Sequence, residues 1–457
     1  MSNFLYSIFG FVIAIGVLIT FHELGHYTMA RLFDVKVLRF SLGIGKPVWR
    51  RTFGSDRTEF VLSLIPLGGY VRMLDTNDLE TSEKDRKRSF VTKSLLARSL
   101  IVLAGPIANF CLAIIFLWVT LIIGVPGYST VIGHVEPGEL GEKMGFEIGD
   151  RLLEFDGRKI QTWNEYDLQL LKKSLSGDSV VVTIMKSTGK KDDIEIVFRN
   201  HTSTGLELNI MSRKFGLLPL FPESEPLVAS VLNKSPADQA GIKSGDIITK
   251  INQVYINNWT DLVDIVSQKP NREIEIQLNR NNEILILRAT PELYQSETGA
   301  VGRLGIARDT SNMSAAMLRL NYLNALERSM ENTWLLASVT VIALVEMVKL
   351  KISPKTIGGP VTIARVAGQS MQISMVSYLL FLAVVSISIG VLNLLPIPIL
   401  DGGHLLYLIL EAIRGQPISA EAMQIGQLLG IGALGVLMSI ALYNDFSNIV
   451  YGLIGAG

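Results

Sequence analysis

The sequence predicts a polytopic α-helical membrane protein with four membrane-spanning helices and a large section of mixed α and β structure between the second and the third. Two observations predict this class. Of the 457 residues, 48% are hydrophobic and the mean hydropathy is +0.36, which is high for a soluble enzyme of this length. Four apolar segments are also long enough to cross a bilayer, at residues 5–29, 95–125, 375–395 and 426–442.

Basic residues predict the orientation of these spans. None precedes the first span, whereas residues 31–98 carry 14 Lys and Arg against 8 Asp and Glu. The positive-inside rule therefore places this loop in the cytoplasm, and the N-terminus, the C-terminus and the section of about 250 residues between spans two and three outside. Because the first basic residue is Arg31, we expect the first span to be a retained anchor, not a cleaved signal peptide.

Overall composition excludes two other features. The 42 basic and 42 acidic residues balance, so the chain has no bulk attraction to nucleic acid. Cys111 is the single cysteine, which rules out a disulfide within the chain.

The first span ends in a metal-binding pattern. His22 and His26 are four residues apart, so a helix places both imidazoles on one face, where they can bind one metal ion. Glu23 lies beside them, in the position of a general base for a water molecule activated by that metal. Residues 5–21 carry no charge, and ionisable groups within a span are costly unless they are functional.

The cytoplasmic loop contains a predicted β structure. Within residues 57–74, two β-prone runs flank Pro66 and the pair Gly68 and Gly69, which predicts a hairpin-like sheet. Its apolar character indicates that the sheet dips into the membrane. An exposed edge strand there can hold an unwound substrate segment by strand addition, while a purely structural hairpin is the alternative.

The section between spans two and three contains an internal repeat. Residues 145–150 and 241–246 share the pattern GxxxGD at an offset of 96, which also pairs Trp163 with Trp259. This is the pattern of a PDZ domain. Each copy ends in an apolar–Gly–apolar loop, at residues 215–217 and 304–306, which predicts the circularly permuted arrangement.

We therefore predict two extracytoplasmic α+β PDZ domains, at residues 127–220 and 221–309. They are expected either to bind peptide C-termini or to act as a size filter above the active site. Residues 1–126 then hold spans one and two, and residues 373–457 hold spans three and four. Between them, residues 310–372 form a linker whose apolar segment 333–345 has 13 residues, short for a span, and is expected on the membrane surface or packed on other helices.

A third metal ligand is required, because a catalytic zinc site uses three protein ligands and one open position. Asp401 is the best candidate, since it follows the third span and a proline-containing loop, where Gly402 and Gly403 permit close backbone approach. Irregular backbone at membrane depth is tolerated beside a water-filled cavity. His404 is an alternative third ligand.

The HExxH run at residues 22–26 and the run Leu400-Asp401-Gly402 resemble the two signature motifs of the site-2 protease family of intramembrane zinc metalloproteases. This resemblance implies one catalytic Zn²⁺ held by His22, His26 and Asp401. It also implies that Glu23 activates water.

The resemblance extends to residues near the substrate. It implies a substrate or oxyanion contact for Asn393 and, from the match at residues 105–109, a supporting role near the substrate for Asn109. In the loop between spans one and two it points to Gly69, Tyr70 and Val71 as substrate contacts.

The function implied by the resemblance is cleavage, inside a bacterial inner membrane and toward its cytoplasmic side, of single-pass membrane proteins already shortened outside. The expected substrates are an anti-sigma factor of an envelope stress response and remnant signal peptides. A non-catalytic PDZ-bearing scaffold or a metal-handling membrane protein is the alternative.

Overall fold

The computed structural model describes residues 2–75, 83–176, 179–198, 212, 215–220, 225–232, 234–296, 299–308, 316–349 and 358–454. The chain forms two compact units. One is built mainly from Met1–Val125 and Arg319–Phe446, and the other mainly from the residues between them. The predicted domain boundaries after residues 220 and 309 fall at or within segments outside the described residues.

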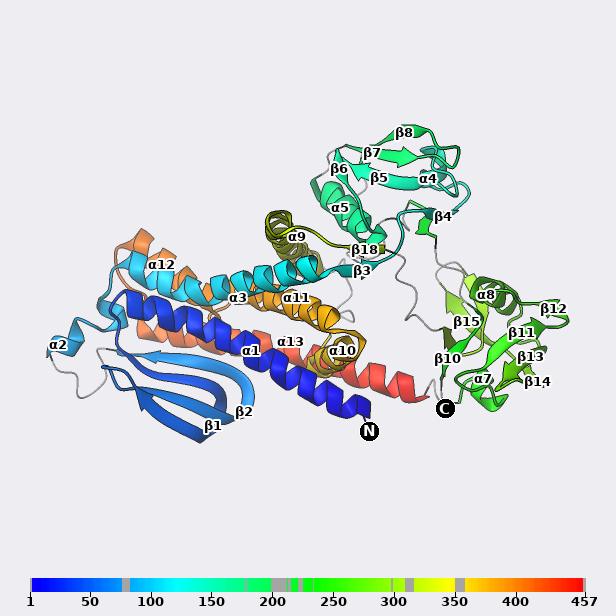
Figure 1. Ribbon diagram of the computed structural model, residues 1–457. Coiled ribbons are helices and arrows are strands. Elements are labelled where there is room, and N and C mark those ends of the chain that lie inside the picture. Colours follow the sequence, from blue (N-terminus) through cyan, green and yellow to red (C-terminus); the bar gives the residue numbers. More distant parts are fainter. Residues whose placement is uncertain are drawn as a thin grey trace. The chain divides into compact units, whose positions relative to one another are not determined.

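The first unit is a bundle of long apolar helices (Figure 1). Four of them agree with the predicted spans: α1 (Ser2–Leu32), α3 (Leu95–Ile123), α11 (Met375–Asn393) and α13 (Ala420–Ile454). All four are long and apolar enough to cross a membrane. Shorter helices accompany them, namely α2 (Glu83–Arg86), η1 (Phe90–Thr92), α10 (Pro360–Ile373) and α12 (Asp401–Arg414).

The count of four candidate spans was one short. The apolar segment 333–345 belongs to α9 (Tyr322–Val348), a helix of 27 residues that also qualifies by length and composition. Charged residues in its first half, such as Glu327 and Arg328, obscured its length in the sequence. In Figure 1, α9 is seen nearly end-on while α3 lies across the view, so α9 crosses α3. Its Leu336 and Leu344 pack against the apolar cluster between α3 and α11. This agrees with the alternative in which residues 333–345 pack on other helices.

Helices α1, α3 and α11 form the core of this unit. Leu18 on α1 and Leu112 on α3 are buried with Leu382 on α11 in one apolar cluster. A polar contact adds to it, because the Tyr378 hydroxyl donates to the Gly10 carbonyl at 2.7 Å. In an apolar surrounding such hydrogen bonds between helices fix their relative depth.

The loop between α1 and α3 forms a sheet from two long bent strands, β1 (Val37–Phe53) and β2 (Thr58–Met73). Residues 39–42 of β1 pair with residues 59–62 of β2 on one side and with residues 69–72 on the other. The two runs around Pro66 therefore do not pair with each other, so the hairpin expectation was wrong in its pairing. The charged positions of β1 had hidden its strand character. The end of β2 is an edge of this sheet among the described residues, and β2 packs along α1 (Figure 1).

The second unit contains two domains built from the same pattern. The first consists of β4 (Ile132–Val135), α4 (Leu140–Lys143), β5 (Arg151–Phe155), β6 (Arg158–Lys159), α5 (Trp163–Ser176), β7 (Val180–Met185), β8 (Lys191–Ile196) and β9 (Leu217–Pro219). The second consists of β10 (Val228–Val231), α7 (Pro236–Gln239), β11 (Ile247–Ile251), β12 (Val254–Tyr255), α8 (Trp259–Ser267), β13 (Ile274–Arg280), β14 (Glu283–Ala289), β15 (Glu292–Ser296), β16 (Gly299–Arg303) and β17 (Ile306–Arg308).

The sheets match between the copies. The strand order is β6-β5-β7-β8 in the first copy and β12-β11-β13-β14 in the second, and the last strand of each copy pairs with its first in the sheets β4-β9 and β10-β17. Those last strands follow Gly216 and Gly305, which both have positive φ. These are PDZ domains with the expected permuted order. The hairpin β15-β16 precedes the last strand in the second copy.

The chain passes from one unit to the other through two short strands. The strand β3 (Val125–Gly127) pairs with β18 (Ala316–Leu318). Next to them, the Leu320 amide donates to the Leu121 carbonyl and the Arg319 side chain donates to the Ile122 carbonyl. The chain therefore leaves α3 and returns to α9 at adjacent points.

Each copy buries the aspartate of its GxxxGD motif against a cation. Asp246 is fully buried, and Arg280 donates to both of its carboxylate oxygens at 2.7 Å. Asp150 is equally buried, with Nζ of Lys186 at 3.1 Å. Burial alone would raise the pKa of Asp246, but the Arg280 guanidinium outweighs it and holds the pKa of that carboxyl below its usual range.

This ion pair predicts acid sensitivity of the second PDZ domain. Because the folded-state pKa of Asp246 lies below the unfolded value of about 3.9, its stabilising effect is present above that pH and is lost as the pH falls through the folded-state value. We expect hydrogen-exchange protection of β11 and β13 in the full-length protein to decline below about pH 4. Asp246→Asn should cost about 2 kcal/mol at neutral pH and flatten this decline.

Glu275→Gln provides the matched control, since this carboxylate is half-exposed and 4.0 Å from Arg288. An exposed pair of this kind contributes little to stability. An unchanged acid profile in the Asp246→Asn variant would contradict the assignment.

Candidate metal centre

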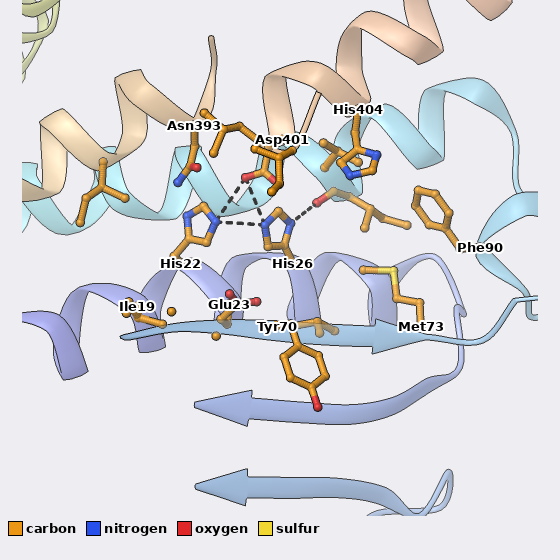
Figure 2. Close-up of a pocket in the computed structure, with 18 of the residues that line it drawn as sticks. Ile19, His22, Glu23, His26, Tyr70, Met73, Phe90, Asn393, Asp401 and His404 are labelled. Atoms are coloured by element: carbon orange, nitrogen blue, oxygen red, sulfur yellow. Dashed lines mark hydrogen bonds and ion pairs between the residues drawn. The ribbon is translucent and has the colours of Figure 1, made fainter. Parts of the chain in front are cut away.

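The three residues predicted as metal ligands come together at one point (Figure 2). His22 and His26 project from α1, and Asp401 is the first residue of α12. Oδ2 of Asp401 lies 3.2 Å from Nε2 of His22 and 3.4 Å from Nε2 of His26, and the two nitrogens are 3.3 Å apart. Ligand atoms at about 2.0–2.1 Å from a tetrahedral zinc ion would be separated by about 3.3 Å, so the triangle has the size that zinc requires.

The far side of the His26 ring fixes which nitrogen faces this triangle. Nδ1 of His26 lies 2.9 Å from the carbonyl oxygen of Ile101 on α3. A carbonyl only accepts, so Nδ1 carries the hydrogen and Nε2 presents a lone pair. His26 is therefore held in the form that binds a metal.

Asn109 performs the corresponding task for His22. Nδ2 of Asn109 lies 3.2 Å from Nδ1 of His22, and the whole residue is buried. Exchange of the amide nitrogen and oxygen brings Oδ1 to this position, where it accepts the Nδ1 hydrogen and leaves the lone pair of Nε2 facing Asp401. That orientation also uses Oδ1 of Asn109, which is otherwise buried without a partner.

The result is a buried triangle of acceptor atoms. Both Nε2 atoms offer lone pairs, and Oδ2 of Asp401 is buried without a hydrogen-bond donor. Such an arrangement is unfavourable unless a cation occupies its centre. The donor set of two imidazoles and one carboxylate suits zinc with one position left for water or substrate.

Two glycines allow the helices to approach this closely. A Cβ atom at Gly105 on α3 would overlap Nε2 of His26 and come within 2.8 Å of Cε1 of His22. A Cβ atom at Gly25 on α1 would overlap the carbonyl oxygen of Ala104. The backbone of α3 thus forms the wall directly behind the two imidazoles.

Glu23 projects from α1 toward the end of β2. It is 7% exposed, and a Cβ atom at Gly69 would come within 2.8 Å of its Cγ. Only a residue without a side chain lets the edge of the sheet approach Glu23 this closely. The carboxylate is therefore confined beside the metal ligands.

These groups line one pocket of about 570 Å³. Its wall contains four of the five residues predicted as substrate contacts, namely Gly69, Tyr70, Val71 and Asn393, together with Glu23, the predicted base. The fifth, Asn109, does not line the pocket and is buried. Figure 2 shows Asn393 near His22 and Asp401, whereas the Tyr70 ring points away from the ligands. The Tyr70 hydroxyl instead accepts a hydrogen bond from Arg39 at 3.2 Å. Backbone atoms of residues 69–71 are thus the groups that border the site.

His404, the alternative third ligand, lies on the same pocket wall but outside the triangle. It is one helical turn after Asp401 and is exposed. Among the described residues, the group whose ligand atoms lie close enough for one ion consists of His22, His26 and Asp401.

Three parts of the site carried no readable signal in the sequence. The carbonyl of Ile101 acts through its backbone, and Gly25 and Gly105 act through the absence of a side chain. Their positions in or near the two motifs were visible, but their roles depend on how α1 meets α3.

Comparison with known proteins identifies the class. Residues 10–437 match the model of Peptidase family M50, and the chain belongs to this family. It is a multi-pass membrane zinc metalloprotease, so the scaffold and metal-carrier alternatives are set aside.

Individual proteins of this family are similar to the chain over nearly its whole length. The chain is 34% identical over 455 residues to the Regulator of sigma-E protease RseP of Escherichia coli, covering 98% of this chain and all of that one. It is 33% identical over 444 residues to the Regulator of sigma E protease of Haemophilus influenzae and, over the same length, to a putative zinc metalloprotease of Pasteurella multocida. In both cases 97% of this chain and 99% of the relative are covered.

The close approach of Gly105 to His22 and His26 predicts the effect of adding a single methyl group at residue 105. Gly105→Ala places that methyl on His26, so we expect zinc affinity to fall at least about tenfold while the helices still form. Zinc bound per mole of purified protein in detergent measures this. Gly16→Ala on α1 is the matched control, because a Cβ atom there meets nothing within 4 Å. Equal zinc content in both variants would contradict the role of Gly105.

Proposed function

We propose that this protein is an intramembrane endopeptidase that cleaves the transmembrane segments of single-pass membrane proteins. The observation that carries the proposal is the triangle of acceptor atoms with Glu23 and a strand edge beside it, in a unit whose long helices are apolar enough to span a bilayer. A peptide bond entering this pocket meets a metal site, a base and a sheet edge at once.

His22, His26 and Asp401 would hold the zinc ion. When bound, zinc polarises a scissile carbonyl and makes water more acidic. Asn109 and the Ile101 carbonyl keep both imidazoles in the form that offers lone pairs. Their support matters because a ring that turned would present N–H to the ion instead.

Glu23 is the proposed general base. Its carboxylate accepts a proton from the attacking water and later delivers that proton to the leaving amine nitrogen. Confinement between α1 and Gly69 holds it on the pocket wall through both transfers. Asn393, on the opposite wall in Figure 2, can donate to the scissile carbonyl oxygen.

The end of β2 is the proposed substrate-binding edge. Among the described residues, residues 69–71 pair with β1 along one side, and they also border the pocket. An unwound segment can add to this edge as another strand, with its scissile bond directed toward Glu23. The Tyr70 ring points away, so recognition by residues 69–71 is expected to use main-chain groups and to tolerate many side chains.

Two further parts of the proposal concern location and substrate. The basic loop supports a cytoplasmic position for the sheet and the metal centre, and an outer position for the PDZ domains. Likeness to the sigma-E regulators of Escherichia coli and Haemophilus influenzae supports an anti-sigma factor in a bacterial inner membrane as one substrate. Remnant signal peptides, as short apolar helices, are a second.

The catalytic assignment predicts a separation of metal binding from activity. Glu23→Gln should retain zinc, because Glu23 is not part of the triangle, but should lower the cleavage rate of a model transmembrane substrate by at least about 10²-fold. Asp401→Asn should lose zinc as well as activity. Purified protein, zinc analysis and a gel-based cleavage assay measure both. Full activity in the Glu23→Gln variant would refute the assignment.

The PDZ domains are proposed to act as a size filter against substrates with bulky outer domains. Because β3 pairs with β18, residues 128–315 can be replaced by a short Gly-Ser linker without moving the ends of α3 and α9 apart. The deletion variant should cleave an intact single-pass substrate that the full-length protein leaves uncut. Both should cleave the shortened substrate.

Two results would count against the filter. One is a deletion variant that keeps its zinc but no longer cleaves the shortened substrate. The other is a variant that still rejects the intact one. Zinc content serves as the control for folding in each case.

A further inference from the structure

An ion pair joins the helix that carries Asp401 to the helix that orients His26. Nη2 of Arg98 on α3 donates to Oε1 of Glu411 on α12 at 2.5 Å, and Nη1 donates to Oε2 at 3.1 Å. The side chains are 13% and 17% exposed. Two parallel hydrogen bonds between planar groups fix both the separation and the rotation of the helices that carry them.

Helix α12 is short, and its outer side is exposed. It has 14 residues, and Ile409 and Ile413 on its outer side are 56% and 77% exposed. Its first turn rests on the preceding loop, where Gly402 and Gly403 meet the carbonyl groups of residues 394–397. The pair with Arg98 holds the other end of the helix, almost three turns after Asp401.

The same part of α3 also determines the orientation of His26. Arg98 lies three residues before Ile101, and residues at this spacing share one face of a helix. The Ile101 carbonyl accepts the Nδ1 hydrogen of His26. One turn of α3 therefore holds α12 at Arg98 and an imidazole of α1 at Ile101.

We propose that Arg98 and Glu411 are a positioning pair that sets the distance between Asp401 and the two histidines. The pair lies outside the metal triangle and acts on it through α12. This inference rests on the proposed zinc site. It states that the ion pair raises the affinity of that site for zinc by holding Asp401 at the right distance.

The alternative explanation is that burial of apolar side chains alone holds α12 in place. Leu408 on α12 is 8% exposed and packs toward the bundle, so apolar contacts could hold the helix while the ion pair only stabilised the fold. The two explanations differ in what they predict for zinc. A positioning pair changes metal affinity in a protein that remains folded, whereas a purely stabilising pair does not.

The test measures the zinc dissociation constant of the full-length protein in detergent, by competition with a chelator. Arg98→Ala and Glu411→Ala should each raise that constant about tenfold or more. The exchange Arg98→Glu with Glu411→Arg should restore it to within about threefold of the wild type, since both hydrogen bonds can re-form. Cobalt absorption spectra should show the distorted geometry in the single variants only.

Arg414→Ala is the matched control. Arg414 is an exposed cation at the end of the same helix, and its removal changes the charge of α12 without touching the pair. It should leave the zinc dissociation constant unchanged. Asp401→Ala sets the value expected for a broken site.

Each outcome decides the question. Wild-type zinc affinity in both single variants would overturn the proposal, and so would an exchange variant that folds without recovering affinity. If the alanine variants do not fold, Glu411→Gln and Arg98→Lys replace them, with an expected loss of about threefold, and a loss of fold in these too would overturn it. Unchanged zinc affinity in Asp401→Ala would instead refute the zinc site itself.

Discussion

The metal centre depends on how closely the backbone of α3 approaches the imidazoles of α1. A chain buried in an apolar bundle has no water to satisfy the second nitrogen of each histidine, so a neighbouring helix must provide the acceptor. The Ile101 carbonyl does so directly, and Asn109 does so through its amide. Both contacts require that residues 25 and 105 carry no side chain, because any Cβ atom there would separate the helices. Close packing thus determines the chemistry of the ligands as well as their position.

Much of this site could be predicted because its ligands have reactive side chains at fixed spacing. Two histidines four residues apart in a span, and an aspartate after a broken helix, are rare enough to indicate a shared ion. The orienting contacts could not be predicted in the same way. A backbone carbonyl has no sequence signature, and a glycine in a helix is compatible with many roles. The pair Arg98 and Glu411 is separated by most of the chain, so neither residue indicates the other.

The fold showed the same division. Long apolar runs identified α1, α3, α11 and α13, and the GxxxGD repeat identified both PDZ domains. Errors arose where polar residues interrupt an element. Charged residues in α9 concealed half of its length, and basic residues in β1 concealed a strand that pairs on both of its sides. In these elements tertiary contacts outweigh local composition.

The ligands of the triangle also lie far apart along the chain. The two histidines belong to the first helix, whereas Asp401 follows α11 and all of the PDZ section. A nascent chain that has inserted only α1 and α3 contains Glu23 and both imidazoles but no carboxylate ligand. Because a ribosome delivers residues in order, the competent centre can assemble only when translation is nearly complete. The order of the helices along the chain thereby delays assembly of the metal centre until after the PDZ section has been made.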